Sequence, residues 1–216
     1  PMLTPRRYGW LLASALSCAG LQAACSDDDM GRPGDAAADA ATDDGEEMGS
    51  VVADQAQAQI GHEPAPDALA HLGAIVLAID GGEIAQAEIA IDRANDPVVM
   101  DYAERMNDEH ADHADALEAL LADRGVAPTE SAVSGSLRAE AFAGIGELKG
   151  TPRNELDFVY MRLQVKMHAA AGVLINRLYD LAPGDPDDQE LLAFLDATRS
   201  AIAAHRSQAE AILRAR

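Results

Sequence analysis

The sequence predicts an all-α protein whose main domain is a bundle of four helices. Apolar residues, mostly alanine and leucine, make up 48% of the 216 residues, whereas aromatic residues make up only 4%. This balance favours packed helices over a sheet-rich core, because strands are enriched in aromatic and β-branched residues. Four long segments have apolar residues three and four positions apart, and helix-capping residues separate several of them.

The charge and the cysteines limit the possible functions. The formal net charge is −21, which argues against nucleic acid as a partner because phosphates are bound by Lys and Arg. The two cysteines, Cys18 and Cys25, both lie in the first 25 residues. A metal site in the body of the protein must therefore use histidine, carboxylate or methionine ligands.

Residues 1–25 have the features of an export signal. Two arginines precede an apolar run over residues 9–16, and small residues lead to Ala24-Cys25, as in a secretory signal peptide. The end of this stretch is similar to a bacterial lipoprotein box, although Gln22 stands where leucine is common. We therefore expect a lipid anchor on Cys25, contact with a membrane, and a periplasmic or outer-membrane-anchored protein. Cys18 is a weaker candidate, and an ordinary signal peptide is the alternative.

Residues 26–66 are predicted to form a disordered acidic linker. They contain eleven acidic residues and a single basic one, Arg32. Such a stretch has little apolar surface to offset chain entropy, and its charges repel one another. A short helix within residues 50–60 is compatible with the spacing of its apolar residues.

The first two long helices are predicted on either side of a tight link. One stripe of apolar residues runs from Asp67 to about Asn95. Asp96 and Pro97 then supply an N-cap and a first-turn proline for a second helix, and Gly125 follows its last turn. A link this short requires the two helices to be antiparallel neighbours.

The remaining chain predicts a short crossing helix and two more long helices. Residues 125–150 are interrupted by Pro, Ser and Gly, so we expect a short helix lying across the bundle. The third long helix opens at Thr151-Pro152 and ends before Pro183, and the fourth opens at Asp185-Pro186. Residues 67–216 are thus predicted to form an up-down-up-down bundle.

Each long helix carries a polar residue on its buried stripe. These are Glu83 on the first helix, His110 and His113 on the second, His168 on the third and His205 on the fourth. A buried carboxylate or imidazole needs a partner, so the layer is either a metal site or a hydrogen-bonded network. With the two tight links at one end of the bundle, these residues spread over roughly 12 Å along its axis. His110 and His168 are then the best-matched pair.

Short motifs in a fixed order resemble the family called domain of unknown function 4142. They are Gly82-Glu83-Ile84-Ala85, Met106-Asn107-Asp108-Glu109-His110, Leu156-Asp157-Phe158-Val159-Tyr160, His168 and His205. The resemblance covers about Asp67 to Arg216, and members are often described as outer-membrane or secreted proteins. It implies a ferritin-like four-helix bundle whose recurring polar positions are Glu83, His110, Asp157, Tyr160, His168 and His205. It implies no activity, and His113 matches none of these positions.

The residues near the histidines do not match the usual di-iron signature. Ferritin-like di-iron sites use Glu-x-x-His on two helices. In this sequence the residues three positions before His110, His168 and His205 are Asn107, Val165 and Ile202, and none of them is glutamate. A histidine-rich set suits a single Zn, Cu or Fe ion. The candidate ligands are Glu83, His110, His113, Asp157, His168 and His205.

Two functional interpretations follow from the sequence. The first is a non-enzymatic envelope protein that binds a transition metal through the buried histidine and glutamate layer. The alternative is a structural or stress-related interaction module in which the layer only fixes helix packing. An oxidoreductase would need an open coordination position, which the sequence does not show.

Overall fold

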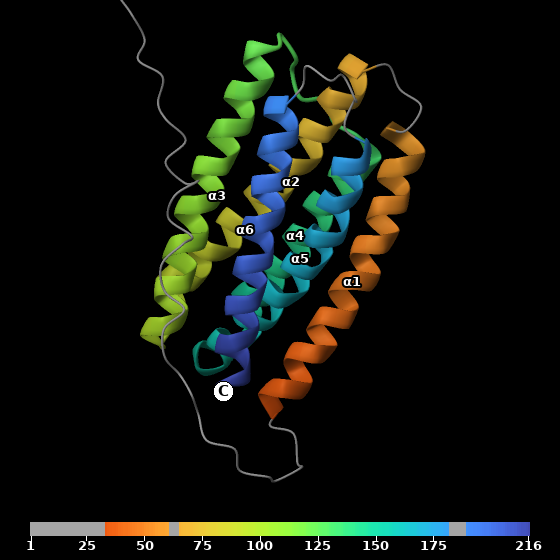
Figure 1. Cartoon of the computed structure of the whole chain (residues 1–216). Coiled ribbons are helices and arrows are strands. Elements are labelled where there is room, and N and C mark those ends of the chain that lie inside the picture. Colours follow the sequence, from red (N-terminus) through yellow and green to blue (C-terminus); the bar gives the residue numbers. More distant parts are fainter. Residues whose placement is uncertain (1–32, 61–64, 182–188) are drawn as a thin grey trace, which may run out of the picture.

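The protein is helical throughout the part that the computed structural model describes, which is residues 33–60, 65–181 and 189–216. Six helices and no strands are found there (Figure 1). They are α1 (Pro33–Ile60), α2 (Ala65–Arg93), α3 (Pro97–Asp123), α4 (Ala132–Gly150), α5 (Arg153–Leu181) and α6 (Gln189–Arg214). The all-α prediction is confirmed for these residues. The expected signal and lipidation site, residues 1–25 with Cys18 and Cys25, lie outside them.

The predicted boundary between α2 and α3 is confirmed in detail. The Asp96 side chain accepts a hydrogen bond from the amide of Val98, and Pro97 is the first residue of α3. At the other end of α3, Gly125 adopts φ 66°, the left-handed conformation that favours glycine after a helix. Capping residues therefore place both ends of this helix.

The long helices do not alternate in direction as predicted. Tyr102 faces Tyr160 with ring centroids 6.2 Å apart, and His110 faces His168 at 5.9 Å. The two pairs are eight residues apart on both helices, so α3 and α5 run in the same direction. In Figure 1 the four long helices α2, α3, α5 and α6 run down, up, up and down. The up-down-up-down prediction is therefore wrong for these four.

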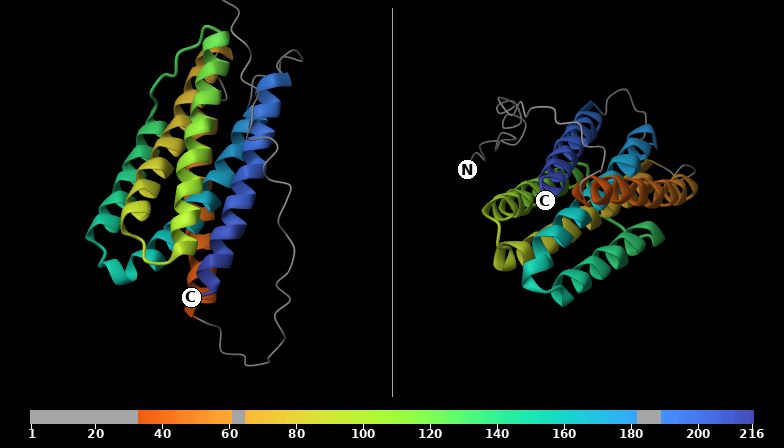
Figure 2. Two further views of the ribbon diagram at one scale, coloured as in Figure 1. Left: turned by 90° about the vertical axis from the view of Figure 1, so that its left-hand side faces the viewer. Right: turned by 90° about the horizontal axis from the view of Figure 1, so that it is seen from below.

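The reason for the changed direction is α4. Its 19 residues extend about 28 Å at 1.5 Å per residue, which carries the chain back along the bundle before α5 begins. It lies beside α2 on the outside of the bundle (Figure 2), with Ser131 and Ser134 forming a capping box at its start. The expected short helix across the bundle is thus a longer helix along it. The α2–α3 link consequently lies at one end of the bundle, whereas α5 ends and α6 begins at the other; the expectation that both links lie at one end is wrong.

The prediction of a disordered linker is wrong for residues 33–60. They form α1, a 28-residue helix that packs along α5 and also contacts α6. Its acidic residues pair with arginines of those helices: Glu46 with Arg206 at 3.0 Å and Asp39 with Arg214 at 3.3 Å. The negative charges that would repel one another in an isolated chain are partly offset by cations that lie far away in the sequence.

Small residues let α1 approach α5 and α6 closely. A seam of alanine and glycine is buried along it at helical spacing: Gly34, Ala38, Ala41, Gly45, Gly49, Ala53 and Ala56. A Cβ atom at Gly49 would lie 2.6 Å from the carbonyl oxygen of Ala170 and 2.8 Å from its Cα. The segment thus has a core-facing side, but one built from small side chains instead of large apolar ones.

We expect Gly49→Ala to lower the free energy of unfolding by about 1–3 kcal/mol, because the added methyl group overpacks against the α5 backbone. Urea denaturation of the wild type and variant measures this change. The matched control is Gly135→Ala in α4, where an added Cβ meets nothing within 4 Å and the change to alanine stabilises a helix by about 0.5–1 kcal/mol. Equal stabilisation by both substitutions would contradict the close packing of α1.

The interior consists of two apolar clusters separated by a polar layer. One cluster includes Ile75 and Leu174, and the other includes Met106 and Tyr160. Each of the four long helices passes from one cluster to the other. The buried polar residues between the clusters are Asp80, Glu83, Gln86, His110, His113, Gln164, His168 and His205. Four helices therefore contribute to one polar layer at mid-height of the bundle.

Helix α2 is the one described segment that is long and apolar enough to cross a membrane, by length and composition, over Asp67–Arg93. However, 72% of its most apolar 18-residue window is buried inside the protein. The helix packs against both α3 and α4 and directs Asp80 and Glu83 into the interior. This is the placement of a core helix.

Candidate metal centre

Three histidines from three helices converge in the polar layer. His110 of α3, His168 of α5 and His205 of α6 each offer one ligand atom, and these atoms all lie within 4.8 Å of one another. Their side chains are buried, with relative exposures of 6%, 1% and 7%. We refer to these residues as the three-histidine cluster. Sequence counting paired only His110 with His168, whereas the actual helix directions bring His205 to the same level.

One ring nitrogen of each histidine, which we call the outer nitrogen, lies at hydrogen-bonding distance from an acceptor. His110 Nδ1 lies 2.8 Å from Asp80 Oδ1, His205 Nε2 lies 2.6 Å from Glu109 Oε2, and His168 Nδ1 lies 2.9 Å from the carbonyl oxygen of its own helix at Gln164. Carboxylates and carbonyls accept from a neutral imidazole only through its N–H. Each contact therefore assigns the proton to the outer nitrogen and orients the ring.

The other ring nitrogen of each histidine, which we call the inner nitrogen, is left without a hydrogen-bond partner. His110 Nε2, His168 Nε2 and His205 Nδ1 are buried and have no hydrogen-bond partner among the described residues. Buried polar atoms without a partner are rare, because each costs about 1–3 kcal/mol. One ring nitrogen of each histidine lies within 4.8 Å of the others, and a metal ion is one electron-pair acceptor that three neighbouring imidazoles can bind.

The electrostatics favour the neutral, metal-binding form of two of the three rings. Burial lowers the pKa of His168 well below its ordinary value, and the nearby rings of His205 and His110 lower it further. Burial also lowers the pKa of His205, although its bond to Glu109 opposes this. For His110 burial acts in the same direction, but the hydrogen bond and charge of Asp80 outweigh it and raise the pKa.

Glu83 borders the cluster without joining the convergent group. Its Oε2 accepts a hydrogen bond of 2.7 Å from Gln164 Nε2, and its Oε1 lies 3.7 Å from His168 Nδ1, on the outer side of that ring. Burial raises the pKa of this carboxyl group. The structure therefore places Glu83 beside the cluster, next to His168 and Gln164, and not among the nitrogens that converge.

His113 belongs to a second polar group next to the cluster. Its Nδ1 lies 2.9 Å from Asp80 Oδ2, and its Nε2 lies 2.8 Å from the Thr198 hydroxyl. The ring also stacks on Phe194 with centroids 4.7 Å apart. Both of its nitrogens are thus engaged by protein groups, so the structure does not bring His113 to the three inner nitrogens.

Asp157 lies at the end of the bundle, away from the cluster. Its two carboxylate oxygens accept hydrogen bonds from the backbone amides of Asn95 and Asp96, at 2.9 and 3.0 Å. It is eleven residues before His168 on α5, which is roughly 16 Å along the helix. Asp157 therefore joins the start of α5 to the α2–α3 link, and its expected place in the metal layer is corrected.

Two acidic residues that orient the cluster were not among the predicted ligands. Asp80 lies four residues after Val76 and three before Glu83, so helical spacing alone places it on the buried face. That signal was present in the sequence. Glu109 is half-buried and reaches His205 from the neighbouring helix, and its role depends on which helix lies beside α3.

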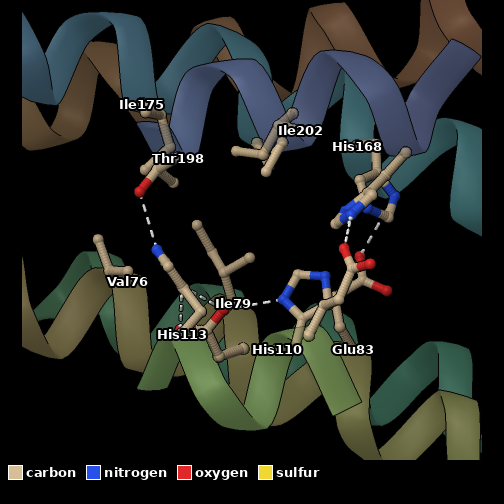
Figure 3. A pocket seen from close by; sticks show the side chains of 14 residues that line it. Val76, Ile79, Glu83, His110, His113, His168, Ile175, Thr198 and Ile202 are labelled. Atoms are coloured by element: carbon tan, nitrogen blue, oxygen red, sulfur yellow. Dashed lines mark hydrogen bonds and ion pairs between the residues drawn. The ribbon is translucent and has the colours of Figure 1, made fainter. Parts of the chain in front are cut away.

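A small cavity adjoins the cluster. It has a volume of about 30 Å³ and is lined by the three histidines together with Val76, Ile79, Asp80, Glu83, Glu109, His113, Ala171, Ile175, Thr198, Ala201 and Ile202. Figure 3 shows His110 and His168 at one end and His113 with Thr198 at the other, with aliphatic side chains between them. A metal ion bound by the cluster would therefore face a small, mainly apolar space.

Comparison with known proteins links the chain to one family. A family model described as "Domain of unknown function (DUF4142)" matches residues 36–212. No match was found among curated proteins or among solved structures. The matched range begins inside α1 and includes all three histidines of the cluster.

Proposed function

Because the chain belongs to the domain of unknown function 4142 (DUF4142) family, whose description assigns no activity, we propose a function from the site: the protein binds one transition-metal ion through His110, His168 and His205. The observation that carries this proposal is that three buried histidines bring one ring nitrogen each within 4.8 Å of the others, and that each ring keeps one nitrogen without a hydrogen-bond partner among the described residues.

The donor set indicates which ions fit. Imidazole nitrogens suit Zn, Cu and Fe, whereas hard ions such as Ca²⁺ and Mg²⁺ prefer oxygen. Metal–nitrogen bonds of about 2.0–2.1 Å place the nitrogens of a tetrahedral site roughly 3.3 Å apart, and one ring nitrogen of each histidine already lies within 4.8 Å of the others. The nearby carboxylates of Asp80, Glu83 and Glu109 would offset the charge of a divalent ion without binding it.

We further propose that α2, α3, α5 and α6 form a ferritin-like four-helix bundle. Two antiparallel pairs joined by one long connection characterise that fold. Here α2–α3 and α5–α6 are the pairs, and α4 is the connection that returns along the bundle. The site differs from the di-iron sites of such bundles, because the residues three before its histidines are Asn107, Val165 and Ile202.

The metal proposal is tested on protein purified without a histidine tag and stripped of metal. We expect one Zn²⁺ or Cu²⁺ per chain by elemental analysis. We also expect a rise in melting temperature, since ligand at 100 times its Kd stabilises by about 2.7 kcal/mol. Mg²⁺ at the same concentration is the control and should leave the melting temperature unchanged. Absence of a bound transition metal together with unchanged melting would remove the proposal.

We also propose that the protein is exported and anchored by a lipid on Cys25. The support is the run of small residues ending at Ala24-Cys25 after a basic and apolar segment. Helix α1 begins eight residues later, at Pro33, and eight residues span at most about 28 Å. The helical domain would therefore lie close to the membrane surface.

Cys25→Ala is expected to move the protein from the membrane fraction to the soluble fraction and to abolish labelling by a radioactive fatty acid. The matched control is Cys18→Ala, which should leave both properties unchanged. Labelling that disappears with Cys18→Ala instead would assign the lipid to Cys18, and no labelling in the wild type would favour an ordinary signal peptide.

A further inference from the structure

The cavity beside the three-histidine cluster can hold a ligand in addition to the metal ion. Only three protein nitrogens converge there among the described residues. Asp80 and Glu109 are bonded to the outer nitrogens, and Glu83 to Gln164. A four-coordinate ion would therefore keep one position for an exogenous ligand, as catalytic zinc sites with three protein ligands do.

The size of the cavity limits what that ligand can be. Its volume is about 30 Å³, and roughly 10–15 Å³ of such space holds one water molecule. There is room for two or three non-hydrogen atoms. Ile79 and Ile202 lie between the cluster and Thr198, and Ile175 lines the cavity beside Thr198 (Figure 3). Most contacts to the ligand would therefore be apolar.

The charges around the cavity disfavour an anion. Asp80 and Glu83 are both buried, with relative exposures of 1%, and Glu109 lies behind His205 at 2.6 Å. Neutral imidazoles add no charge, whereas the carboxylates of Asp80 and Glu109 behind two of the rings offset the charge of a bound ion and weaken its attraction for an added anion.

A thin wall separates the cavity from the surface. His168 and Ile202 line both the cavity and an open groove between α5 and α6. At this wall the side chain of Ile202 faces Gly172, where an added Cβ would lie 3.7 Å from Ile202 Cγ2. Ile202 therefore lies between the groove and the cavity, opposite a glycine that has no side chain of its own.

From these observations we propose that the metal centre binds a small uncharged ligand of two or three non-hydrogen atoms, of the class of dioxygen, carbon monoxide or nitric oxide, in the cavity between the cluster and Thr198. The ligand enters through the α5–α6 groove past Ile202. This inference rests on the proposed metal site. It adds that one coordination position of the ion is open to a ligand that is small and uncharged.

The test uses the full chain loaded with Cu⁺ under anaerobic conditions and probed with carbon monoxide by infrared spectroscopy. We expect one sharp band from bound carbon monoxide, and no binding of tert-butyl isocyanide, which is uncharged but too large for the cavity. Azide should not change the spectrum of the Cu²⁺ form. Failure to load copper would overturn the metal site itself, whereas loaded copper without carbon monoxide binding would overturn only this inference.

Variants locate the ligand within the cavity. Ala201→Leu fills the space and should abolish carbon monoxide binding with one copper still bound, whereas Ala204→Leu, the same change on the exposed face of α6, should leave it intact. Ile202→Ala should accelerate carbon monoxide release about tenfold, a barrier change of roughly 1.4 kcal/mol. Ile175→Ala, which enlarges the cavity but does not line the groove, should not. Equal effects of the members of either pair would overturn the assignment.

Discussion

Replacing Asp80 by alanine is expected to lower the free energy of unfolding of the metal-free protein by about 3 kcal/mol. This carboxylate is 1% exposed and lies 2.8 Å from His110 and 2.9 Å from His113. Removing one partner of a buried, hydrogen-bonded charge pair costs about 3–5 kcal/mol, because the other partner remains buried. Urea denaturation of metal-free wild type and variant measures the difference.

The control for this change is Asp92→Ala, which removes an exposed carboxylate from the same helix and should alter stability by less than about 0.5 kcal/mol. Asp80→Ala should also weaken Zn²⁺ binding by about 10–100-fold, since a group that orients a metal-binding histidine contributes that much to affinity. A variant as stable as the wild type would show that Asp80 does not hold α2 to α3.

Replacing His168 by leucine is expected to have the opposite pattern, with a large loss of metal binding and a small change in stability. The inner nitrogen of His168 has no hydrogen-bond partner, and its outer nitrogen bonds only to a carbonyl of its own helix. Leucine has a similar volume, so the metal-free protein should lose less than about 1.5 kcal/mol. The increase in melting temperature on adding Zn²⁺ or Cu²⁺ should disappear.

His71→Gln provides the matched control, because it removes a histidine of the described chain that is not in the cluster. It should retain the metal-induced increase in melting temperature. If His168→Leu instead destabilises the metal-free protein as strongly as Asp80→Ala, the layer serves helix packing, which is the alternative function that the sequence suggests. Persistence of full metal affinity in the double variant His110→Leu with His168→Leu would lead to the same conclusion.

Much of the helical architecture could be read from local chemistry. The cap formed by Asp96 and Pro97 and the glycine at position 125 act within a few residues of the chain, so their effects on α3 are visible in sequence. The apolar stripes likewise marked α2, α3, α5 and α6, since each long helix must bury one face. The position of α1 was missed because its buried face consists of alanine and glycine, and its neutralising arginines lie on α5 and α6.

The site was predictable in composition but not in geometry. Burial of His110, His168 and His205 followed from helical spacing, and the spacing of Asp80 from Glu83 contained the same information. Which of them meet depends on helix direction, and direction depends on α4 returning the chain along the bundle. Counting from two links placed at one end therefore displaced His205, whose ring lies 5.3 Å from that of His168 between centroids.

By itself the sequence determined the all-helical class, the family and the presence of a buried histidine layer, because periodicity, capping and short motifs are local properties of the chain. Only the tertiary structure decided that α1 is part of the folded domain, that α3 and α5 are parallel, and that three histidines converge while His113 and Asp157 do not. These features depend on contacts between residues far apart in sequence. A small-residue seam or a ring nitrogen acquires its role only from the helix that lies opposite it.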